Sequence, residues 1–350
     1  MNLIRHSNTL TAGCMLAVMI TLSAVLPRSA AAELPFRDGE VIRLIVPYGP
    51  GGGFDRIVRV IQPHLEGALN AMDSAKKVSV IVENRAGAGG RVAYEYTYAS
   101  PPDGTRIVLM GDQGAALQQV ALDAQFDLDK FTYLALVNSS DWGILVRKDG
   151  GMATMNDIIA RAQKQPILFG TSGAGSGDHI ASVLVKAMLD REGAKMPITH
   201  VHFGSSGKVR ASMQRGESEA YIGSVESVIQ AVDDGYGHMA VVFARARSSF
   251  YPDTPTIFEQ KVPAAAAISD AIGISRVLVA PPGLPADRAK ALVEALRVAL
   301  TSPALLAQAE QAKLPVSYGD PAKARATVKG HSAATIEFKD LVRETVKSGK

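Results

Sequence analysis

Three consecutive glycines form the stretch of this 350-residue chain with the clearest chemical potential. Gly51, Gly52 and Gly53 lie between an apolar run at 41–46 and a helical pattern of apolar residues that starts at Ile57. Glycine allows φ > 0 and has no Cβ that would block a ligand. The amides that open the following helix have no intrahelical partners and carry a partial positive charge. The loop is therefore predicted to receive an anion such as a carboxylate or a phosphate.

A second loop combines glycines with hydroxyl side chains. An apolar run at 166–169 leads into Gly170-Thr171-Ser172-Gly173-Ala174-Gly175-Ser176-Gly177-Asp178, and a helical pattern follows from His179. Hydroxyls and amides at the start of a helix suit charge-assisted hydrogen bonds to a carboxylate. Turn formation and helix capping are the alternative roles of these residues. The predicted ligand contacts in this loop are Thr171, Ser172 and Ser176.

Four further residues occupy positions where they either contact a ligand or support the fold. Trp142 either stacks on a ligand or fills the hinge between two domains, and Ser205 is either a ligand contact or a turn residue. Asp141 would receive an ammonium group if the ligand were an amino acid, and is otherwise a solvated loop acid. Asp55 is predicted to cap the helix after the glycine loop, since a carboxylate inside the site would repel an anion.

Catalytic and metal-binding patterns are absent from the sequence. The segment Gly170 to Ala174 nearly matches a nucleophile elbow but ends in alanine, and no histidine–acid pair is placed to activate Ser172. A dinucleotide fold fails as well, because Gly87-Ala88-Gly89 lacks the third glycine at the required spacing. No cluster of ligands has metal spacing, so His179 and His202 are predicted to be structural. We therefore predict a protein that is not an enzyme and that holds no metal and no cofactor.

Apolar strands alternate with helical patterns in the first part of the chain. This alternation predicts βαβ units, an α/β fold and a parallel sheet. Ligands of parallel sheets gather at the carboxyl ends of the strands, where the turns at Gly51 and Gly87 are both expected. The predicted strands lie at 41–47, 78–83 and 106–110, and the predicted helices at 57–69 and 92–99.

The α/β pattern restarts after an apolar stretch at 134–147. Strands predicted at 166–169, 199–203, 220–222 and 239–243, with a helix at 179–189, indicate a second α/β unit. A strand at 274–280 is expected to cross back to the first unit, and helices at 287–300, 303–311 and from 322 to 339 and onward are expected to close the chain. We predict two lobes with a ligand cleft between them that closes by hinge motion. Lobe 1 is assigned residues 33–138 and 270–350, and lobe 2 residues 139–269.

The N-terminus has the pattern of a secretory signal peptide over residues 1–32. Arg5 precedes an apolar segment at 12–26, and small residues end the pattern at Ala32. Cleavage is predicted near Ala32, and the mature protein is expected in the periplasm.

Charge and cysteine content narrow the function further. Removal of the signal peptide takes away Arg5 and Arg28, which lowers the formal charge from +3 to +1. A nearly neutral surface argues against nucleic acid as a partner. Cys14 is the only cysteine, so the mature chain has no disulfide and depends on its core for stability.

Five motifs follow one another along nearly the whole mature chain. They are Val46-Pro47-Tyr48 with Gly51 to Asp55, Val82 to Gly90, Pro101-Pro102-Asp103-Gly104, Gly170 to Ser176 with His179, and Pro252 to Thr256 with Glu259. In this order they resemble the substrate-binding proteins of tripartite tricarboxylate transporters, also called the Bug family.

The resemblance implies a two-lobed periplasmic binding protein fold of type 2, with the ligand cleft between the lobes. It implies a monomeric receptor that captures a small carboxylate (a di- or tricarboxylate, an amino acid or an aromatic acid) and delivers it to membrane permease subunits. In such proteins amides of the lobe 1 loops and hydroxyls and amides of lobe 2 hold the ligand. The predicted ligand contacts are Tyr48, Gly49, Gly51, Gly52, Gly53, Phe54, Trp142, Thr171, Ser172, Gly173, Gly175, Ser176 and Ser205.

Departures from the family pattern leave the ligand open. Phe54 replaces a small polar residue of the first loop, and the run Val201 to Ser205 replaces a segment that ends in valine-proline-tyrosine-lysine-glycine. The loss of that lysine and tyrosine leaves open whether His202-Phe203-Gly204 contacts the ligand. Two other functions remain as alternatives: a sensor protein that presents its ligand to a membrane kinase, and an exported α/β hydrolase.

Overall fold

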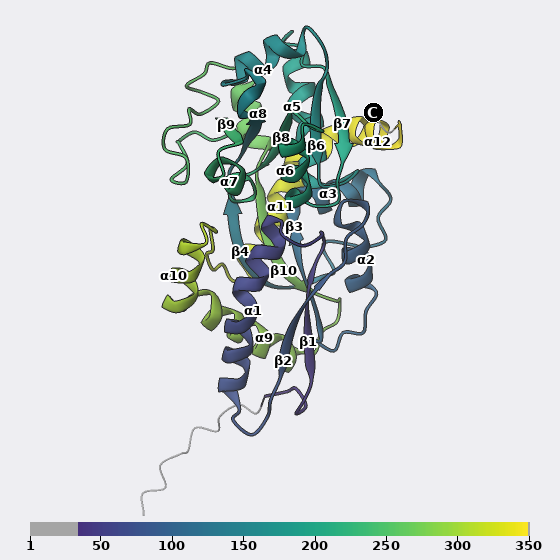
Figure 1. Ribbon diagram of the computed structural model, residues 1–350. Coiled ribbons are helices and arrows are strands. Elements are labelled where there is room, and N and C mark those ends of the chain that lie inside the picture. Colours follow the sequence, from purple (N-terminus) through teal and green to yellow (C-terminus); the bar gives the residue numbers. More distant parts are fainter. Residues whose placement is uncertain (1–33, 349–350) are drawn as a thin grey trace, which may run out of the picture.

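The computed structural model describes residues 34–348 (Figure 1). The predicted signal peptide at 1–32 lies outside the described residues. From Leu34 onward the chain forms two α/β units, each built on a five-stranded sheet with helices packed against it. The two sheets lie one above the other in Figure 1.

The structure has the following strands and helices in chain order. The strands are β1 (Val41–Val46), β2 (Ser79–Asn84), β3 (Arg106–Gly111), β4 (Thr132–Ser140), β5 (Trp142–Arg147), β6 (Ile167–Thr171), β7 (Ile198–His202), β8 (Ala220–Ser224), β9 (Gly237–Val242) and β10 (Ile274–Ala280). The α-helices are α1 (Gly53–Met72), α2 (Arg91–Tyr98), α3 (Asp112–Ala121), α4 (Met155–Ala162), α5 (Gly177–Arg191), α6 (Ser206–Arg215), α7 (Val225–Asp233), α8 (Ala265–Ala271), α9 (Ala286–Leu300), α10 (Pro303–Gln311), α11 (Pro321–Thr335) and α12 (Lys339–Ser348). Short 3₁₀ turns occupy Ala88–Gly90, Lys148–Gly150 and Ile336–Phe338.

The first sheet has the order β2-β1-β3-β10-β4 and helices on both faces. Successive side chains of a strand point to opposite faces, so Leu44 and Val46 pack with α1 and α9 whereas Ile45 packs with α2 and α3. Burial of both faces explains why these strands are almost continuously apolar. β1 runs parallel to β2 and β3, which places the end of β1 and the start of α1 at the edge that faces the second unit.

The second sheet has the order β7-β6-β8-β5-β9 and follows the same plan. On one face Phe169 and Ile222 pack with α5, and on the other Tyr221 packs with α6 and α7. β6 is parallel to β7 and β8, so the loop after β6 lies at the strand ends that face the first unit.

The chain crosses between the two units at several points. β4 of the first sheet continues into β5 of the second through Asp141, and β10 returns to the first sheet after β9 and α8. The C-terminal helix α12 packs against both α3 and α5, and the Arg191 guanidinium lies 5.0 Å from the centre of the Phe338 ring. The division into lobes at 33–138, 139–269 and 270–350 stays a prediction, because the last helix touches elements of both units.

The secondary structure differs from the sequence-based prediction in three respects. The first sheet is mixed and not parallel, because β10 runs antiparallel to both β3 and β4. The long helix expected at 322–339 is divided by a 3₁₀ turn at Ile336–Phe338 into α11 and α12. Helices α3, α7 and α8 were not predicted, since α3 and α7 follow their strands directly and none of the three has a side-chain hydrogen bond at its N-cap.

A search of residues 34–348 found no single helix with the length and hydropathy of a membrane span. Helices α9 and α10 reach that length and hydropathy only when they are taken together, and their axes are bent by 58° relative to each other.

Candidate ligand-binding site

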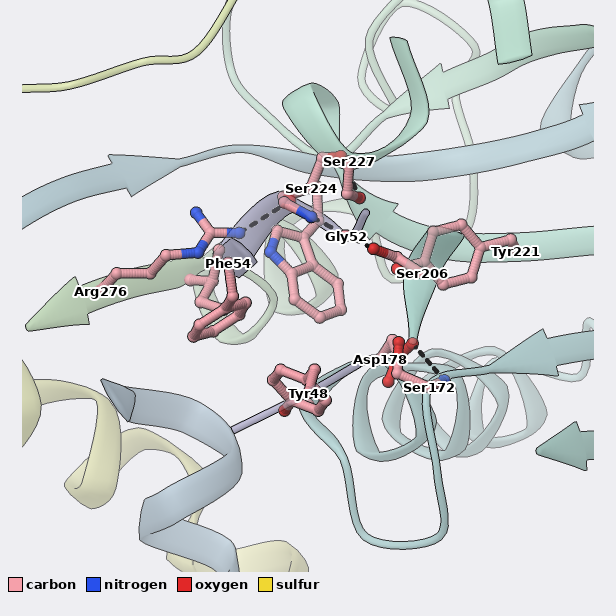
Figure 2. A pocket seen from close by; sticks show the side chains of 14 residues that line it. Tyr48, Gly52, Phe54, Ser172, Asp178, Ser206, Tyr221, Ser224, Ser227 and Arg276 are labelled. Atoms are coloured by element: carbon pink, nitrogen blue, oxygen red, sulfur yellow. Dashed lines mark hydrogen bonds between the residues drawn. The ribbon is translucent and has the colours of Figure 1, made fainter. Parts of the chain in front are cut away.

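A cavity of about 40 Å³ lies between the two units, where the carboxyl ends of β1 and β6 face each other (Figure 2). This space corresponds to about three water molecules, so the cleft is closed around a small volume. From the first unit the cavity is lined by Tyr48, Gly52, Gly53, Phe54, Ile274 and Arg276. From the second it is lined by Trp142, Ser172, Gly177, Asp178, Ser206, Tyr221, Ser224 and Ser227.

The glycine loop brings the start of α1 to the cavity. Gly52 is the N-cap residue of α1, and the Gly53 N–H donates to the Ser206 hydroxyl of the other unit at 3.3 Å. A Cβ at Gly52 would lie 2.8 Å from the Ser206 hydroxyl oxygen, so a side chain at this position would displace that hydroxyl. The positive end of the α1 dipole therefore points to the space between the units.

Asp55 supports this loop from inside the first turn of α1. One oxygen of Asp55 accepts the Gly51 N–H at 3.0 Å and the Arg59 Nε–H at 2.9 Å, and the other accepts an N–H of Asn84 at 2.9 Å. Burial raises the pKa of Asp55, but these hydrogen bonds outweigh it and hold the pKa below its usual value. Asp55 thus satisfies the amide that precedes the N-cap residue, while Gly52 itself occupies the cap position.

Aromatic side chains form much of the cavity wall. The Tyr48 and Phe54 rings meet edge to face with centres 4.9 Å apart, and the Arg276 guanidinium carbon lies 4.6 Å from the centre of the Phe54 ring. The cation–π contact fixes Phe54 and holds the guanidinium against the cavity. Trp142 is 3% exposed, and its indole Nε1 has no hydrogen-bond partner within residues 34–348.

Arg276 and Glu226 form a buried ion pair that joins the two units. Arg276 of β10 is 1% exposed, Glu226 of α7 is fully buried, and Arg276 Nη2 lies 2.6 Å from Glu226 Oε1. This contact is electrostatic, since Oε1 has no partner of good hydrogen-bond geometry among the described residues. Arg276 also donates to Ser224 Oγ at 3.0 Å and to Asn138 Oδ1 at 3.3 Å. Its Nε has no partner within residues 34–348.

Asp178 lies on the opposite side of the cavity, next to Ser172 (Figure 2). Its carboxylate accepts the Ser172 N–H at 2.7 Å, the His179 N–H at 3.0 Å and the Ser176 hydroxyl. Burial raises the pKa of Asp178 above its usual value, although hydrogen bonds from Ser176, Ser172 and His179 oppose that rise. The carboxylate thus occupies the start of α5 and faces the cavity at the same time.

Several backbone contacts close the cleft around the cavity. The Gly49 N–H donates to the Gly204 carbonyl at 3.3 Å, and Gln118 Nε2 donates to the carbonyls of both Gly89 and Gly175 at 3.0 and 2.9 Å. A Cβ at Gly89 would lie 2.3 Å from the Ser176 amide nitrogen. At Gly89 the backbones of the two units therefore touch without room for a side chain.

The structure brings some of the predicted ligand contacts into the cavity lining and leaves others outside it. Tyr48, Gly52, Gly53, Phe54, Trp142 and Ser172 line the cavity. The other predicted contacts have backbone or structural partners: Gly49 and Gly175 join the units, Gly51 binds Asp55, Gly173 accepts the Ser176 hydroxyl, Thr171 bonds His202, and Ser176 and Ser205 cap α5 and α6. Asp141 lies in a separate surface depression beside Arg245 and Asp270.

The sequence analysis did not identify two charged residues that line the cavity, Asp178 and Arg276. Arg276 carried a signal, since an arginine within the apolar run at 274–280 must be buried and therefore needs a partner. Asp178 was indistinguishable from an ordinary acid in the first turn of a helix.

Three histidines cluster behind the second loop without forming a metal site. The ring centre of His179 lies 4.5 Å from that of His200 and 5.0 Å from that of His202. His179 Nδ1 accepts the Gly175 N–H at 3.0 Å, and burial together with the two neighbouring histidines lowers the pKa of His179 to about 3. No group of three or more potential ligands that could hold a metal ion occurs in the described part of the chain. His179 therefore supports the loop as a neutral imidazole.

This lowered pKa predicts a loss of stability in mild acid. Between the unfolded pKa near 6.5 and the folded pKa of about 3, the unfolded chain binds more protons than the folded chain. His179 alone should then lower the free energy of unfolding by about 3 kcal/mol between pH 7 and pH 4. Urea unfolding at both pH values checks this. His179→Asn should reduce the pH-dependent loss, and His238→Asn, at an exposed position, should leave it at the wild-type size. An equal loss of unfolding free energy between pH 7 and pH 4 in the wild-type protein and both variants would contradict the role of His179 in this pH dependence.

The fold and the site together define a class of protein. Two α/β units with facing loop edges and a small cavity between them are the architecture of a two-lobed periplasmic binding protein. Residues 67–334 match the family described as Tripartite tricarboxylate transporter family receptor. Because the match spans most of the chain, this protein belongs to that family of receptors.

Relatives of known sequence agree with this assignment. A UPF0065 protein from the TAR-I ttuE-ttuC' intergenic region of Agrobacterium vitis is 25% identical over 295 residues, which cover 83% of this chain and 80% of the relative. A second UPF0065 protein, from Bordetella pertussis, is 26% identical over 293 residues, which cover 82% of this chain and 84% of the relative.

Solved structures share the fold. The periplasmic binding protein BugD superposes with a TM-score of 0.76 at 19% identity, covering 87% of this chain and 97% of BugD. MatC of Rhodopseudomonas palustris with bound malate gives 0.72 at 20% identity, with coverage of 89% and 99%. Rpa4515 of R. palustris with adipate gives 0.73 at 22% identity, with coverage of 89% and 98%. The similarity confirms the predicted two-lobed fold.

Proposed function

We propose that this protein is a receptor that captures a small carboxylate between its lobes and delivers it to a membrane permease without chemical change. The observation that supports this most directly is a pair of buried donors without a partner in the described part of the chain, Arg276 Nε and Trp142 Nε1, on two residues that line the cavity. A carboxylate oxygen would satisfy such donors, and a bond to a charged guanidinium is the stronger kind.

The surroundings of these donors suit one carboxylate group. The start of α1 contributes a partial positive charge at Gly53 and Phe54, and the hydroxyls of Ser206, Ser224 and Ser227 line the same space. The structurally similar proteins MatC and Rpa4515 are described with malate and adipate, which are both carboxylates. We propose direct ligand contact for Tyr48, Gly52, Gly53, Phe54, Trp142 and Ser172. Gly49, Gly51, Thr171, Gly173, Gly175, Ser176 and Ser205 are proposed to shape or close the loops.

The remaining assignments follow from this role. Export to the periplasm by the sequence at 1–32, with cleavage near Ala32, would place the receptor where its permease collects solutes. We propose a monomer of two lobes, 33–138 with 270–350 and 139–269, that opens to admit ligand and closes around it. The closed cavity holds about 40 Å³, which favours a small solute.

A thermal-shift screen tests the proposed function. A ligand at a concentration of 100 times its dissociation constant stabilises the folded protein by about 2.7 kcal/mol and should raise the melting temperature by about 5 °C. We expect this rise with at least one member of a panel of mono-, di- and tricarboxylates, amino acids and aromatic acids. The corresponding neutral amides serve as the control and should give no rise. No shift with any acid, together with measurable ester hydrolysis, would overturn the proposal.

A further inference from the structure

The donors at the start of α5 are already used by a carboxylate of the chain itself. Asp178 accepts the amide hydrogens of Ser172 and His179 at 2.7 and 3.0 Å, and it also accepts the Ser176 hydroxyl. Amides and hydroxyls of this kind are what a helix N-terminus offers to an anionic ligand. A ligand carboxylate on this side of the cavity would therefore compete with Asp178 for its donors.

The charges around the cavity leave Asp178 without a cation. Asp178 is 5% exposed, and none of the ion pairs found within residues 34–348 includes it. The neighbouring His179 and His202 are held neutral, because burial lowers the pKa of both imidazoles. Arg276, the other charged residue of the lining, is already paired with Glu226 at 2.6 Å. The cavity therefore has one unpaired acidic group and no unpaired base.

Arg276, whose Nε is an unpartnered donor among the described residues, lies at the other end of the cavity. Figure 2 shows Arg276 on one side of the pocket and Asp178 with Ser172 on the other, with the Phe54 ring below Arg276 and the Tyr48 ring near Asp178. Arg276 Nε is buried and without a partner among the described residues, so it favours an acceptor at its end. Asp178 favours a donor at its own end. The site thus offers a hydrogen-bond donor at the Arg276 end and a hydrogen-bond acceptor at the Asp178 end.

Resting on the receptor function proposed above, we propose that the ligand is a small aminocarboxylate, whose carboxylate binds at Arg276, Trp142 and the start of α1 and whose ammonium group binds Asp178. A dicarboxylate would place its second negative charge against the Asp178 carboxylate, with no unpaired cation to compensate. Asp178 is therefore a specificity-determining residue that selects the amine-bearing ligand and rejects the dianion of equal length. An ammonium group beside Asp178 also stabilises the ionised carboxylate, which burial alone disfavours.

Length-matched ligand pairs test this proposal on the wild-type protein. In each pair one carboxylate of a dicarboxylate is replaced by an aminomethyl group: 3-aminopropanoate with malonate, 4-aminobutanoate with succinate, and 5-aminopentanoate with glutarate. The common α-amino acids complete the panel, and calorimetric titration gives the dissociation constants. We expect an aminocarboxylate or α-amino acid to bind at least about 10-fold more tightly than any dicarboxylate of the panel, the ratio expected for one charged hydrogen bond.

The Asp178→Asn variant then tests the residue itself. Asparagine keeps the size of the side chain and one acceptor oxygen for the loop but removes the charge. We expect the best aminocarboxylate to lose about 10-fold or more in affinity and the matched dicarboxylate to gain, so that the preference reverses. Asp190→Asn, at the far end of α5, is the control and should keep the wild-type preference. If Asp178→Asn does not fold, the affinities of the wild-type protein for the matched ligand pairs still test whether it prefers aminocarboxylates to dicarboxylates.

Each outcome of the titrations has a definite meaning. Tighter binding of aminocarboxylates, with reversal in Asp178→Asn, supports the proposal. Tighter binding of dicarboxylates to the wild-type protein overturns it and leaves the receptor function intact. Equal affinity for an aminocarboxylate and for the same acid without the amino group also overturns the proposal, because Asp178 would then not bind the ammonium group. Absence of binding by every carboxylate overturns both the ligand class and the proposed receptor function.

Discussion

Gly89→Ala is expected to lower ligand affinity by about 100-fold while leaving both units folded. A Cβ on Gly89 would lie 2.3 Å from the amide nitrogen of Ser176 and 2.5 Å from the carbonyl carbon of Gly175, and both are backbone atoms of the other unit. Backbone cannot rotate away as a side chain can, so the units must move apart at this point. Overpacking of this kind costs up to about 3 kcal/mol, which corresponds to two powers of ten in a binding constant.

The matched control for Gly89→Ala is Gly39→Ala. Both glycines have positive φ, +66° and +76°, so alanine suffers the same backbone strain at either position. A Cβ at Gly39 meets no atom within 4 Å, and only Gly89 adds the clash between the units. Calorimetric titration should show normal affinity for Gly39→Ala, and small-angle scattering should show a larger radius of gyration for Gly89→Ala with ligand. Wild-type affinity in Gly89→Ala would mean that closure at this contact is not needed for binding.

Removal of one partner from the Arg276–Glu226 pair should destabilise the folded protein by about 3–5 kcal/mol. Glu226→Gln leaves the Arg276 charge buried at 1% exposure with only neutral partners, Ser224 and Asn138. Arg276→Met leaves Glu226 fully buried without its cation, while the Ser140 hydroxyl still donates to it at 2.5 Å. Urea unfolding without ligand measures both losses. The double variant, Arg276→Met with Glu226→Leu, should recover most of the stability, because no unpaired charge remains.

An exposed ion pair supplies the comparison. Arg245 and Asp270 lie 2.9 Å apart, but their side chains are 67% and 65% exposed. Such pairs contribute about 1 kcal/mol or less, so Arg245→Met should change the unfolding midpoint little. If Glu226→Gln proved no more harmful than Arg245→Met, the buried pair would not be a structural link between the units.

The sequence predicted the parts of the site that depend on local chain geometry. A strand, a glycine-rich turn and a helix start produced the loop at Gly52 and Gly53, and the same pattern at 170–178 produced the loop that carries Ser172. Both loops lie at the facing edges of the two sheets, and both contribute to the cavity lining. These features were accessible because glycine position and strand direction fix where such loops lie.

The parts that were missed depend on contacts between distant segments. Arg276 meets Glu226 only because β10 returns to the first sheet next to β3, a return that no local pattern encodes. Ser224 and Ser227 enter the cavity from the start of α7, a helix that was not predicted. Asp178 resembles any acid that stabilises a helix start, and only the three-dimensional structure reveals that it also faces the cavity.

Titration of the intrinsic fluorescence of Trp142 tests the central claim, capture of a small carboxylate in the cavity between the lobes. Trp142 is the single tryptophan of the 350-residue sequence and lines the cavity, so the entire tryptophan signal comes from the site. We predict a saturable change in Trp142 emission on addition of the acid that gives the largest thermal shift. The midpoint should equal the calorimetric dissociation constant, and it should move to about 100-fold higher concentration in Gly89→Ala. Saturable binding by calorimetry without any change in Trp142 emission would place the ligand elsewhere and contradict capture in the cavity between the lobes.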